Sequence, residues 1–563
     1  MPHDPARPEL PLAPTPRRHG PRRDHLDPRG ARFLDPSRAA RFADEDLGTT
    51  AYAGAELLVR PGADGEIDAD VWRALGEAAR PEHEIALDER DDDLALARLA
   101  GAAGLLDPGD HPLILRVHLR RPRDDDGPRS TPDAWPVLQR YRHLMRGRPG
   151  ARAVSLMHLL TTSGVAPAPY VAYGIAPKPY VAYGVGPNPY VAYGAGPNPS
   201  VAYGAGPNPY VAYGGGGSAG ATAEYAQPGS GGRTPVTWLG PRPPRRTDDE
   251  LDGARRPVVA VLDTGTGIHP WLDDVVERDV RCGDLPIGLT DESPDVERRG
   301  VVNGGLTGSL DIEAGHGTFI AGLVHQRCPD ARILSVRVVQ PDGVVDEYDL
   351  VRALNMLWVR QALALASDAT DQLVDVVSLS LGYYHEQPTD ADFDPVMRAP
   401  LRALARLGVA VVMSAGNDAT ARPCYPAAFA PWAPAAGGGP VPLVAVGATN
   451  PDGSIALFSN AGPWVRTWRP GAGLVSTVPT SFDGGRGPTF VVTVDGRERA
   501  TIDPDDFRSG FATWSGTSFA APVLAGDIAQ CLNESARLRA DRSEQEDPVQ
   551  VTLAALHRAA PEA

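Results

Sequence analysis

Four polar residues stand at points in the sequence where a side chain could do chemistry. Asp263 ends the apolar run V-V-A-V-L-D, His316 lies in G-H-G-T, Asn417 in S-A-G-N, and Ser518 in S-G-T-S-F-A-A-P. A serine hydroxyl is a weak nucleophile at neutral pH and needs an adjacent base, such as a histidine oriented by a third group. An asparagine amide can donate a hydrogen bond to negative charge that develops on a substrate oxygen. The set therefore contains the parts needed for acyl transfer.

Each of these residues alone has an ordinary structural explanation. An aspartate shortly before a glycine is usually a turn residue, and a serine that opens a helix is usually an N-cap. The position of Ser518, however, also offers free backbone N–H groups and the positive end of a helix dipole. The four residues occur in one order, each at the end of an expected strand or the start of an expected helix. That conjunction favours chemistry over four separate structural roles.

The elements that position these residues follow from the apolar pattern. Near-continuous, β-branched runs are typical of strands buried on both faces, and they occur at 258–263, 333–339, 374–381, 409–414 and 443–448. Helical patterns at 348–365 and 395–407 lie between them. Strands that alternate with helices predict an α/β domain with a parallel sheet, in which catalytic groups collect at the carboxyl ends of the strands.

The motifs D-T-G, G-H-G-T, S-L-G, S-A-G-N and G-T-S-x-A-x-P, in this order, resemble those of the subtilisin-like family of serine peptidases (subtilases, peptidase S8). The resemblance covers roughly residues 255–532 and implies a three-layer subtilisin-like domain. The order Asp, His, Ser differs from that of chymotrypsin-like enzymes and α/β-hydrolases. In the related sedolisins a Glu replaces the histidine and an Asp supplies the oxyanion contact, so His316 and Asn417 favour the subtilisin type.

The resemblance implies a role for each of the four residues. Ser518 would attack the peptide carbonyl, and His316 would take its proton and pass it to the leaving amine. Asp263 would fix the imidazole tautomer, and Asn417 would bind the oxyanion together with the Ser518 backbone N–H. The implied activity is that of a serine endopeptidase that hydrolyses peptide bonds through an acyl-enzyme, acting on a protein or peptide substrate.

The resemblance also suggests how substrate binds. Ser380, Leu381 and Gly382 resemble the strand at the cleft edge that pairs with an extended substrate, and Ala415 and Gly416 resemble the opposite wall of the pocket. No cofactor is expected to be required. Structural calcium is common in the family, but no calcium ligands can be assigned in this sequence.

Two inserts depart from the compact family pattern. An acidic, irregular stretch, 278–297, lies between Asp263 and His316, and T-F-V-V-T-V-D-G-R-E-R-A-T-I (489–502) is typical of a β-hairpin with a D-G turn. We expect both inserts to border the cleft and to shape specificity.

The chain divides into four parts. Residues 1–48 are expected to be disordered, and 49–160 to form a small α+β domain. Residues 161–254 form a Pro/Gly/Tyr-rich linker, and 255–563 form the peptidase domain. In the small domain we expect strands at 55–59, 112–119 and 153–160 and helices at 69–79 and 133–145. Its position suggests a pro-domain, which in this family is a small α+β unit that assists folding and fills the cleft.

The linker contains a decapeptide repeat, P-Y-V-A-Y-G-x-x-P-x, that begins at Pro169 and runs to about residue 214. Its regular prolines predict an extended, polyproline-II-rich tract. Such a tract is typical of a spacer, but it could also be a recognition tract or lie in the cleft of the protease itself.

Charge and hydropathy exclude several classes of function. The net charge of −17 disfavours nucleic-acid binding, and no run approaches the about 18 apolar residues of a membrane span. No signal peptide is apparent, so we expect a cytoplasmic protein, with export by a non-standard route as the alternative. Inside a cell the four cysteines would be reduced; outside, they could form two disulfides in any of three pairings: Cys282, Cys328, Cys424 and Cys531.

Two functions from different classes remain open. The first is an active endopeptidase, in one form a dedicated intracellular maturation protease. The alternative is an inactive peptidase fold that serves as a scaffold or binding protein through its tyrosine-rich repeat. The sequence leaves the oligomeric state open.

Overall fold

The structure is a computed structural model that describes residues 30–162, 232–431 and 439–562 with short internal gaps, together with 181–182 and 201–202. The longest internal gaps are 40–46, 106–112, 123–131, 388–394 and 540–546. Most of the repeat and of the predicted linker therefore lies outside the described residues. Two dipeptides of the repeat, β6 (Val181–Ala182) and β7 (Val201–Ala202), pair in parallel.

The C-terminal part is built on a seven-stranded sheet in which every pair is parallel. Its order is β10 (Val276–Glu277), β13 (Arg332–Arg337), β9 (Val258–Asp263), β15 (Val376–Leu379), β17 (Ala410–Ser414), β18 (Leu443–Thr449) and β19 (Thr467–Pro470). Every residue of β9, β15 and β17 is buried, as expected of strands covered on both faces. The prediction of a parallel α/β sheet is confirmed.

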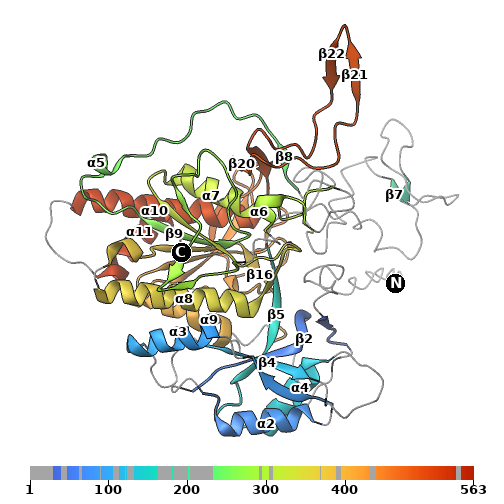
Figure 1. The fold of residues 1–563 in the computed structure, drawn as a ribbon, viewed down its shortest axis with the longest axis vertical. Coiled ribbons are helices and arrows are strands. Elements are labelled where there is room, and N and C mark those ends of the chain that lie inside the picture. Colours follow the sequence, from blue (N-terminus) through green and yellow to red (C-terminus); the bar gives the residue numbers. More distant parts are fainter. Residues whose placement is uncertain are drawn as a thin grey trace, which may run out of the picture.

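Helices cover both faces of this sheet, which gives three layers (Figure 1). One face carries α7 (His316–Arg327), α10 (Thr517–Arg539) and α11 (Pro548–Ala559). The other carries α8 (Glu347–Ser367) and α9 (Pro395–Arg406). Side chains from all three layers form one buried core.

The small N-terminal part consists of antiparallel strands with two helices against them. The strands are β1 (Ala31–Leu34), β2 (Thr50–Val59), β3 (Glu84–Leu87), β4 (Leu115–Arg120) and β5 (Val154–Thr162). Helices α2 (Ala69–Ala79) and α4 (Ala134–Leu144) pack together beside this sheet and share a second buried core with it. A third helix, α3 (Asp91–Ala102), lies against α8.

Both predicted helices of this part are confirmed, and Asp133 caps α4 by accepting from the Trp135 N–H. The prediction of disorder over 1–48 is wrong for Ala31–Leu34, because those residues pair with β2 as β1. Strand β3 and helix α3 had no counterpart in the sequence analysis.

One sheet joins the two parts of the chain. The first part of strand β5 pairs with β2 of the small part. The last residues of β5 pair with two short peptidase strands, β14 (Val344–Asp346) and β16 (Leu381–Gly382). Both of these pairings are antiparallel. In Figure 1, β5 runs from the small part up to the level of β16.

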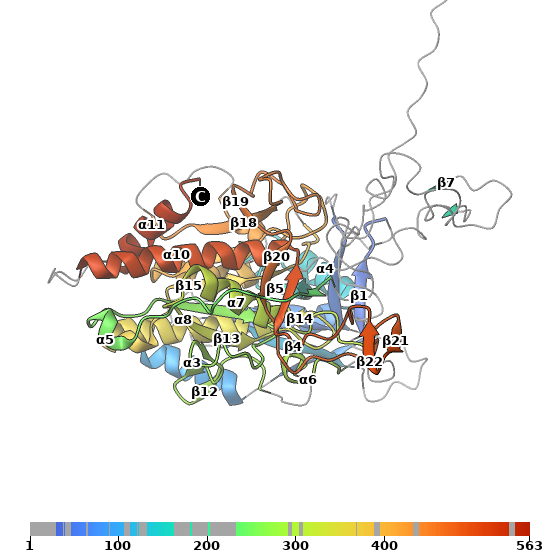
Figure 2. The same ribbon diagram turned by 90° about the horizontal axis from the view of Figure 1, so that it is seen from above.

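The remaining elements are short. The predicted hairpin is confirmed as β21 (Val491–Val494) and β22 (Arg497–Ala500), with Asp495 and Gly496 at φ 51° and 72° in the turn. It stands away from the body of the molecule (Figures 1 and 2). The others are β8 (Thr234–Pro235), β20 (Leu474–Thr477), β23 (Phe511–Trp514), β11 (Arg281–Cys282), β12 (Leu285–Pro286), α5 (Asp248–Leu251), α6 (Val296–Arg299), and 3₁₀ turns η3 (Thr370–Gln372) and η4 (Ala427–Phe429).

Two further features bear on the sequence analysis. Among the described helices, none combines the length and the apolar character that crossing a membrane requires. All four cysteines carry free thiols in this structure.

Candidate active site

Asp263 and His316 meet at the carboxyl edge of the parallel sheet. Asp263 is the last residue of β9, and His316 is the first residue of α7. The His316 Nδ1 lies 2.7 Å from Asp263 Oδ1, and both side chains are fully buried. Gly315 precedes the helix at φ 87°, a conformation that glycine adopts without steric cost, so the backbone can turn sharply before the imidazole.

The surroundings of His316 make it a stronger base than an ordinary histidine. Burial alone would lower its pKa, but the carboxylates of Asp263, Glu313 and Glu297, of which Asp263 contributes most, together outweigh burial and raise the pKa of His316. The Nε2 atom is buried and has no hydrogen-bond partner among the described residues. The imidazole is therefore held through one nitrogen while the other is available.

Ser518 is the second residue of α10 and is fully buried. Its hydroxyl donates to the Ser380 carbonyl oxygen over 3.3 Å, and the Ser380 hydroxyl donates to the Ser518 carbonyl oxygen over 2.8 Å. The neighbouring Phe519 ring lies 5.3 Å from the His316 ring, which brings the start of α10 to the imidazole. The hydroxyl is bonded to Ser380 and not to His316, so proton transfer requires the hydroxyl to move within hydrogen-bonding distance of His316 Nε2.

Asn417 fastens the loop after β17 to the start of α10. Its side-chain oxygen accepts hydrogen bonds from the backbone N–H and the hydroxyl of Thr517, both at 2.9 Å. The Gly416 N–H in turn donates to the Thr517 hydroxyl oxygen over 3.1 Å. These bonds fix the plane of the Asn417 amide at the residue before Ser518.

The predicted cleft-edge strand is β16, and in this structure the end of β5 pairs with it. Leu381 lies opposite Thr162 and Gly382 opposite Thr161, in antiparallel register. A side chain on Gly382 would come within 2.7 Å of the Cys424 sulfur, so glycine is the residue that fits there. The strand predicted to receive an extended substrate thus already holds an extended segment of the same chain.

The predicted opposite wall, Ala415 and Gly416, directly follows β17. The Ala415 carbonyl oxygen accepts from the Asn460 amide over 2.9 Å. Gly416 has φ 99°, and a side chain on it would come within 2.4 Å of Asn460 Nδ2. Asn460 therefore holds both residues in a conformation that depends on glycine.

Sequence reasoning missed Glu297, a buried carboxylate behind the Asp263–His316 pair. It is 1% exposed and accepts hydrogen bonds of 2.5 Å from the hydroxyls of Thr264 and Thr318. Burial raises the pKa of Glu297 to about 7, although the two hydroxyls act in the opposite direction. Nothing in the local sequence distinguishes it from the other acidic residues of the insert.

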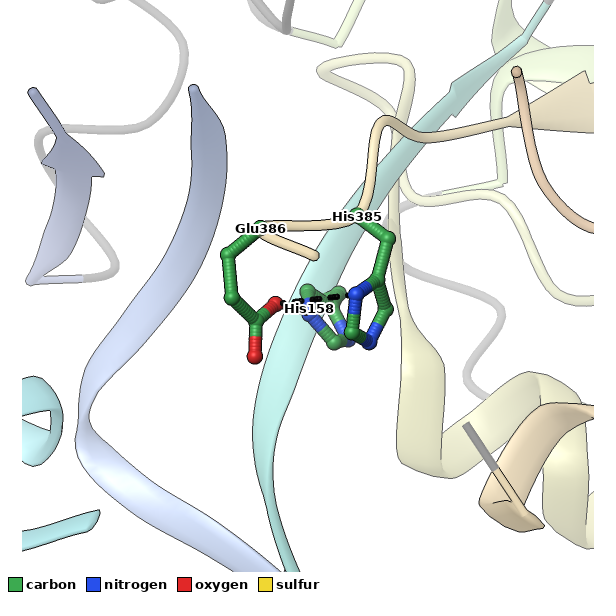
Figure 3. A group of neighbouring side chains, drawn as sticks. All are labelled: His158, His385 and Glu386. Atoms are coloured by element: carbon green, nitrogen blue, oxygen red, sulfur yellow. Dashed lines mark hydrogen bonds and ion pairs between the residues drawn. The ribbon is translucent and has the colours of Figure 1, made fainter. Parts of the chain in front are cut away.

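The second cluster that sequence reasoning missed lies where the two parts of the chain meet. Figure 3 shows His158 of β5 beside His385 and Glu386, which follow β16. His158 is fully buried, with Nδ1 2.8 Å from Glu347 Oε2 and Nε2 2.9 Å from Glu386 Oε2. Burial would lower the pKa of His158, but the two carboxylates outweigh it and raise the pKa well above the ordinary value.

By donor type, His158, His385 and Glu386 could also hold a metal ion. Their ligand atoms lie within 4.8 Å of one another, and this is the one such group of three found in the described part of the chain. Both ring nitrogens of His158 already bond to carboxylates, and His385 Nδ1 accepts from the Gln387 N–H over 3.0 Å. Charge pairing therefore accounts for the arrangement without an ion.

Comparison with known proteins identifies the family of this chain. Residues 254–555, more than half of the chain, match the sequence model of the subtilase family (Peptidase_S8). The chain belongs to the subtilase family.

Among curated proteins, the chain is similar to the major intracellular serine protease of Bacillus subtilis (strain 168), with 24% identity over 37% of this chain and 63% of the relative. It is 26% identical to the intracellular serine protease of Paenibacillus polymyxa over 45% of this chain and 66% of the relative. The chain thus spans less than two thirds of the length of each. Among solved structures it is similar to fervidolysin from Fervidobacterium pennivorans, with a TM-score of 0.41 and 18% identity over 88% of this chain and 56% of that chain.

Proposed function

We propose that this chain is a serine endopeptidase with Ser518 as nucleophile, His316 as general base and Asp263 as the residue that orients the base. The observation that carries the proposal is the buried imidazole of His316, with Nδ1 bonded to Asp263 and Nε2 without a partner in the described part of the chain. A histidine held in this way beside a helix that begins with a serine is the arrangement that activates a hydroxyl.

In the proposed mechanism the Ser518 hydroxyl turns from the Ser380 carbonyl toward His316 Nε2. His316 accepts the proton as Ser518 Oγ attacks the substrate carbonyl, and the Asp263 carboxylate stabilises the resulting imidazolium. His316 then gives the proton to the leaving amine, and water repeats the sequence on the acyl-enzyme.

The oxyanion would be held at the start of α10. The Asn417 amide is anchored there by Thr517, and the Ser518 N–H belongs to the first turn, where backbone donors lack helical partners. Donors fixed in advance stabilise developing charge without reorganisation, and each contributes a factor of about 10²–10³ in turnover.

Substrate would bind as an added strand on β16. The backbone of Leu381 and Gly382 pairs there with Thr162 and Thr161, which shows that this edge accepts an antiparallel extended segment. Strand addition supplies main-chain hydrogen bonds, and side-chain pockets supply specificity.

We further propose that the small N-terminal part, predicted at residues 49–160, acts as a pro-domain that blocks this strand through the end of β5. Three observations support the proposal. The end of β5 pairs with β16, and it also pairs with β14 of the peptidase domain. The hydrogen bonds of His158 to Glu347 and Glu386 join β5 to the same domain. Asp93 of α3 also forms an ion pair with Arg352 of α8 at 2.9 Å, on the helix that carries Glu347. Full burial of Ser518 fits a latent state.

A comparison of the full chain with its Ser518→Ala variant tests both proposals. A fluorophosphonate probe should label the wild type and not the variant, and the N-termini of the wild-type products should show cleavage after the small domain. Labelling that survives in the variant would contradict the assignment of Ser518. The proposal that the chain processes itself fails if both proteins stay intact over the same incubation. The scaffold alternative predicts no labelling of either protein.

The names of two relatives support a location for this activity inside the cell. A dedicated maturation role would follow if the cleft accepts few sequences. Profiling of cleavage sites in an unbiased peptide library decides this, because a narrow preference supports maturation and a broad preference supports general degradation.

A further inference from the structure

The carboxylate of Glu297 has no part in the peptidase mechanism above, yet it lies among the residues that hold the proposed base. It belongs to the short helix α6, within the insert expected to border the cleft. Its two hydrogen-bond donors are Thr264 and Thr318, each within two residues of a member of the Asp263–His316 pair. All three side chains of this small network are buried.

The two threonines join the loop after β9 to the start of α7, because each accepts a hydrogen bond from a backbone N–H of the other segment. The Thr264 hydroxyl oxygen accepts from the Gly317 N–H over 2.8 Å, and the Thr318 hydroxyl oxygen accepts from the Gly267 N–H over 2.8 Å. A hydroxyl has a single proton to donate. Each threonine can therefore accept its backbone N–H and still donate to Glu297, so the carboxylate sets the direction of both hydroxyl protons.

The alternative acceptor for the Thr264 hydroxyl is the catalytic carboxylate itself. Asp263 Oδ1 lies 3.2 Å from that hydroxyl and already accepts from the Thr264 N–H over 2.8 Å. The same oxygen holds His316 Nδ1 at 2.7 Å. A third donor on this oxygen would weaken its bond to the imidazole, because the donors share the same negative charge.

We propose that Glu297 is a positioning residue for catalysis, which draws the Thr264 hydroxyl away from Asp263 and so keeps the Asp263 oxygen for His316. The inference rests on the proposed peptidase function. It assigns a purpose to the insert between Asp263 and His316: the insert brings a second carboxylate behind the first.

Several charged groups act on this site. Asp295 and Asp263 add negative charge beside Glu297, and the guanidinium groups of Arg233 and Arg278 add positive charge. His316 is influenced by Asp263, Glu313 and Glu297. Since the pKa of Glu297 is about 7, its carboxyl group loses its proton as the pH rises through neutrality, and both oxygens can then accept hydrogen bonds.

The test is Glu297→Gln in the full chain. Thr264 and Thr318 donate to different oxygens of Glu297, and a glutamine in the same orientation has an NH₂ group, which cannot accept, in place of one of them. We expect kcat to fall about 10-fold with little change in KM, the pattern of a base that is bound but misplaced. The acidic limb of the pH profile should move to lower pH, because a negative charge that raises the pKa of His316 is removed.

Glu313→Gln is the matched control. Glu313 also raises the pKa of His316, but its carboxylate shares no hydrogen bond with either threonine. We expect this control to move the pH limb without lowering kcat. Equal losses of kcat in both variants would overturn the proposal, since charge alone would then explain them.

A double-mutant cycle with Thr264→Val separates positioning from a general loss of packing. If Glu297 acts through the threonine, its substitution should have little further effect in the Thr264→Val background. Additive losses would overturn the proposal. If Glu297→Gln does not fold by circular dichroism, Glu297→Asp takes its place. Its shorter carboxylate keeps the charge but withdraws from the two hydroxyls, so kcat should fall while the acidic limb of the pH profile stays in place. An unchanged kcat would overturn the proposal.

Titration of the ¹⁵N-labelled imidazole of His316 in the full chain gives a readout that does not depend on turnover. Glu297→Gln should lower the pKa of His316 and change the Nδ1–H signal, and an unchanged titration would overturn the proposal. Failure of the peptidase assignment would look different: the wild type would not react with a fluorophosphonate, while the titration would still decide the role of Glu297.

Discussion

Two fully buried histidines lie in different regions of this molecule and differ in whether their second ring nitrogen has a hydrogen-bond partner. His316, at the edge of the parallel sheet, bonds to Asp263 through Nδ1 and leaves Nε2 without a partner in the described chain. His158, at the junction with the small domain, bonds to carboxylates through both nitrogens. The pKa of each is raised despite burial. A base needs an available lone pair, whereas an imidazolium held between two carboxylates is a fixed charge, so the same side chain can serve chemistry in one place and attachment in the other.

The largest expected effect comes from the partner of His316. Asp263→Asn should lower kcat by about 10³–10⁴-fold, because an amide can stabilise the wrong imidazole tautomer and cannot stabilise the imidazolium. Active-site titration and peptide turnover measure the loss. The unfolding transition should change little, and a loss below 10-fold would show that Asp263 does not orient the base.

Loss of His158 should weaken the contact between the small domain and the peptidase domain and leave the proposed catalytic residues intact. His158→Gln leaves Glu347 and Glu386 buried without a counter-charge between them, and breaking such a pair costs about 3–5 kcal/mol. In the Ser518→Ala background, the urea midpoint of the N-terminal domain should fall. In the wild-type background, peptidase activity should rise.

His118→Gln is the control for that change. His118 also lies near two carboxylates, Glu56 and Asp88, but at 3.5 Å and with a side chain that is 25% exposed. We expect an effect of about 0.5 kcal/mol or less for so loose and solvated a pair. If His118→Gln and His158→Gln have equal effects, the junction is not held by His158.

The pH dependence distinguishes the two histidines without mutation. Since the pKa of His158 is raised on docking, its stabilisation is complete below the ordinary value of about 6.5 and is lost as the pH rises through the raised pKa. Glu386, whose pKa is held well below its ordinary value by the nearby histidines and Arg142 despite burial, loses its contribution only in acid.

Hydrogen exchange of the β5 amides should therefore be slowest near neutral to mildly acidic pH and faster in alkali, after correction for intrinsic rates. Turnover also rises with pH, because His316 acts as a base in its neutral form. Exchange of β5 that does not depend on pH would argue against an imidazolium at the junction.

The smallest expected effect is that of Arg142, which lies on α4 and approaches Glu386 Oε1 at 3.3 Å. Arg142→Gln should weaken docking by about 1 kcal/mol, since His158 still neutralises Glu386. Arg140→Gln on the same helix is the matched control, because Arg140 bonds to Ala78 and Glu82 within the small domain. Measurement of the β5 exchange rates in both variants compares them directly.

The sequence predicted those features whose signal is local. Asp263 follows an unbroken apolar strand, His316 lies in a glycine-flanked helix start, and the D-G turn sits between alternating runs. Each is specified within a few residues, so the parallel sheet and the hairpin could be expected before any coordinates. The pairing of Asp263 with His316, 53 residues apart, was expected only because the motifs resemble those of the subtilisin-like family.

The features it missed depend on distant partners. Strand β1 forms by pairing with the edge of β2, and helix α3 packs against α8. His158 bonds to residues 189 and 228 positions away, and Glu297 bonds to threonines on two other elements. A histidine in an apolar run or a glutamate in an acidic insert looks the same whether it is solvated or buried, because burial is decided by the rest of the fold.

The pairing of β5 with β14 and β16 has a consequence for the relative amounts of the small domain and the peptidase domain. Under the pro-domain proposal, the continuous chain supplies the small domain and the peptidase domain in a fixed one-to-one ratio, and tethering gives an effective concentration that no dilution can change. A single cut between Thr162 and Arg233 converts the same contact into an ordinary bimolecular equilibrium. From then on the volume into which the fragments spread, and the rate at which the released fragment is destroyed, determine how much enzyme works.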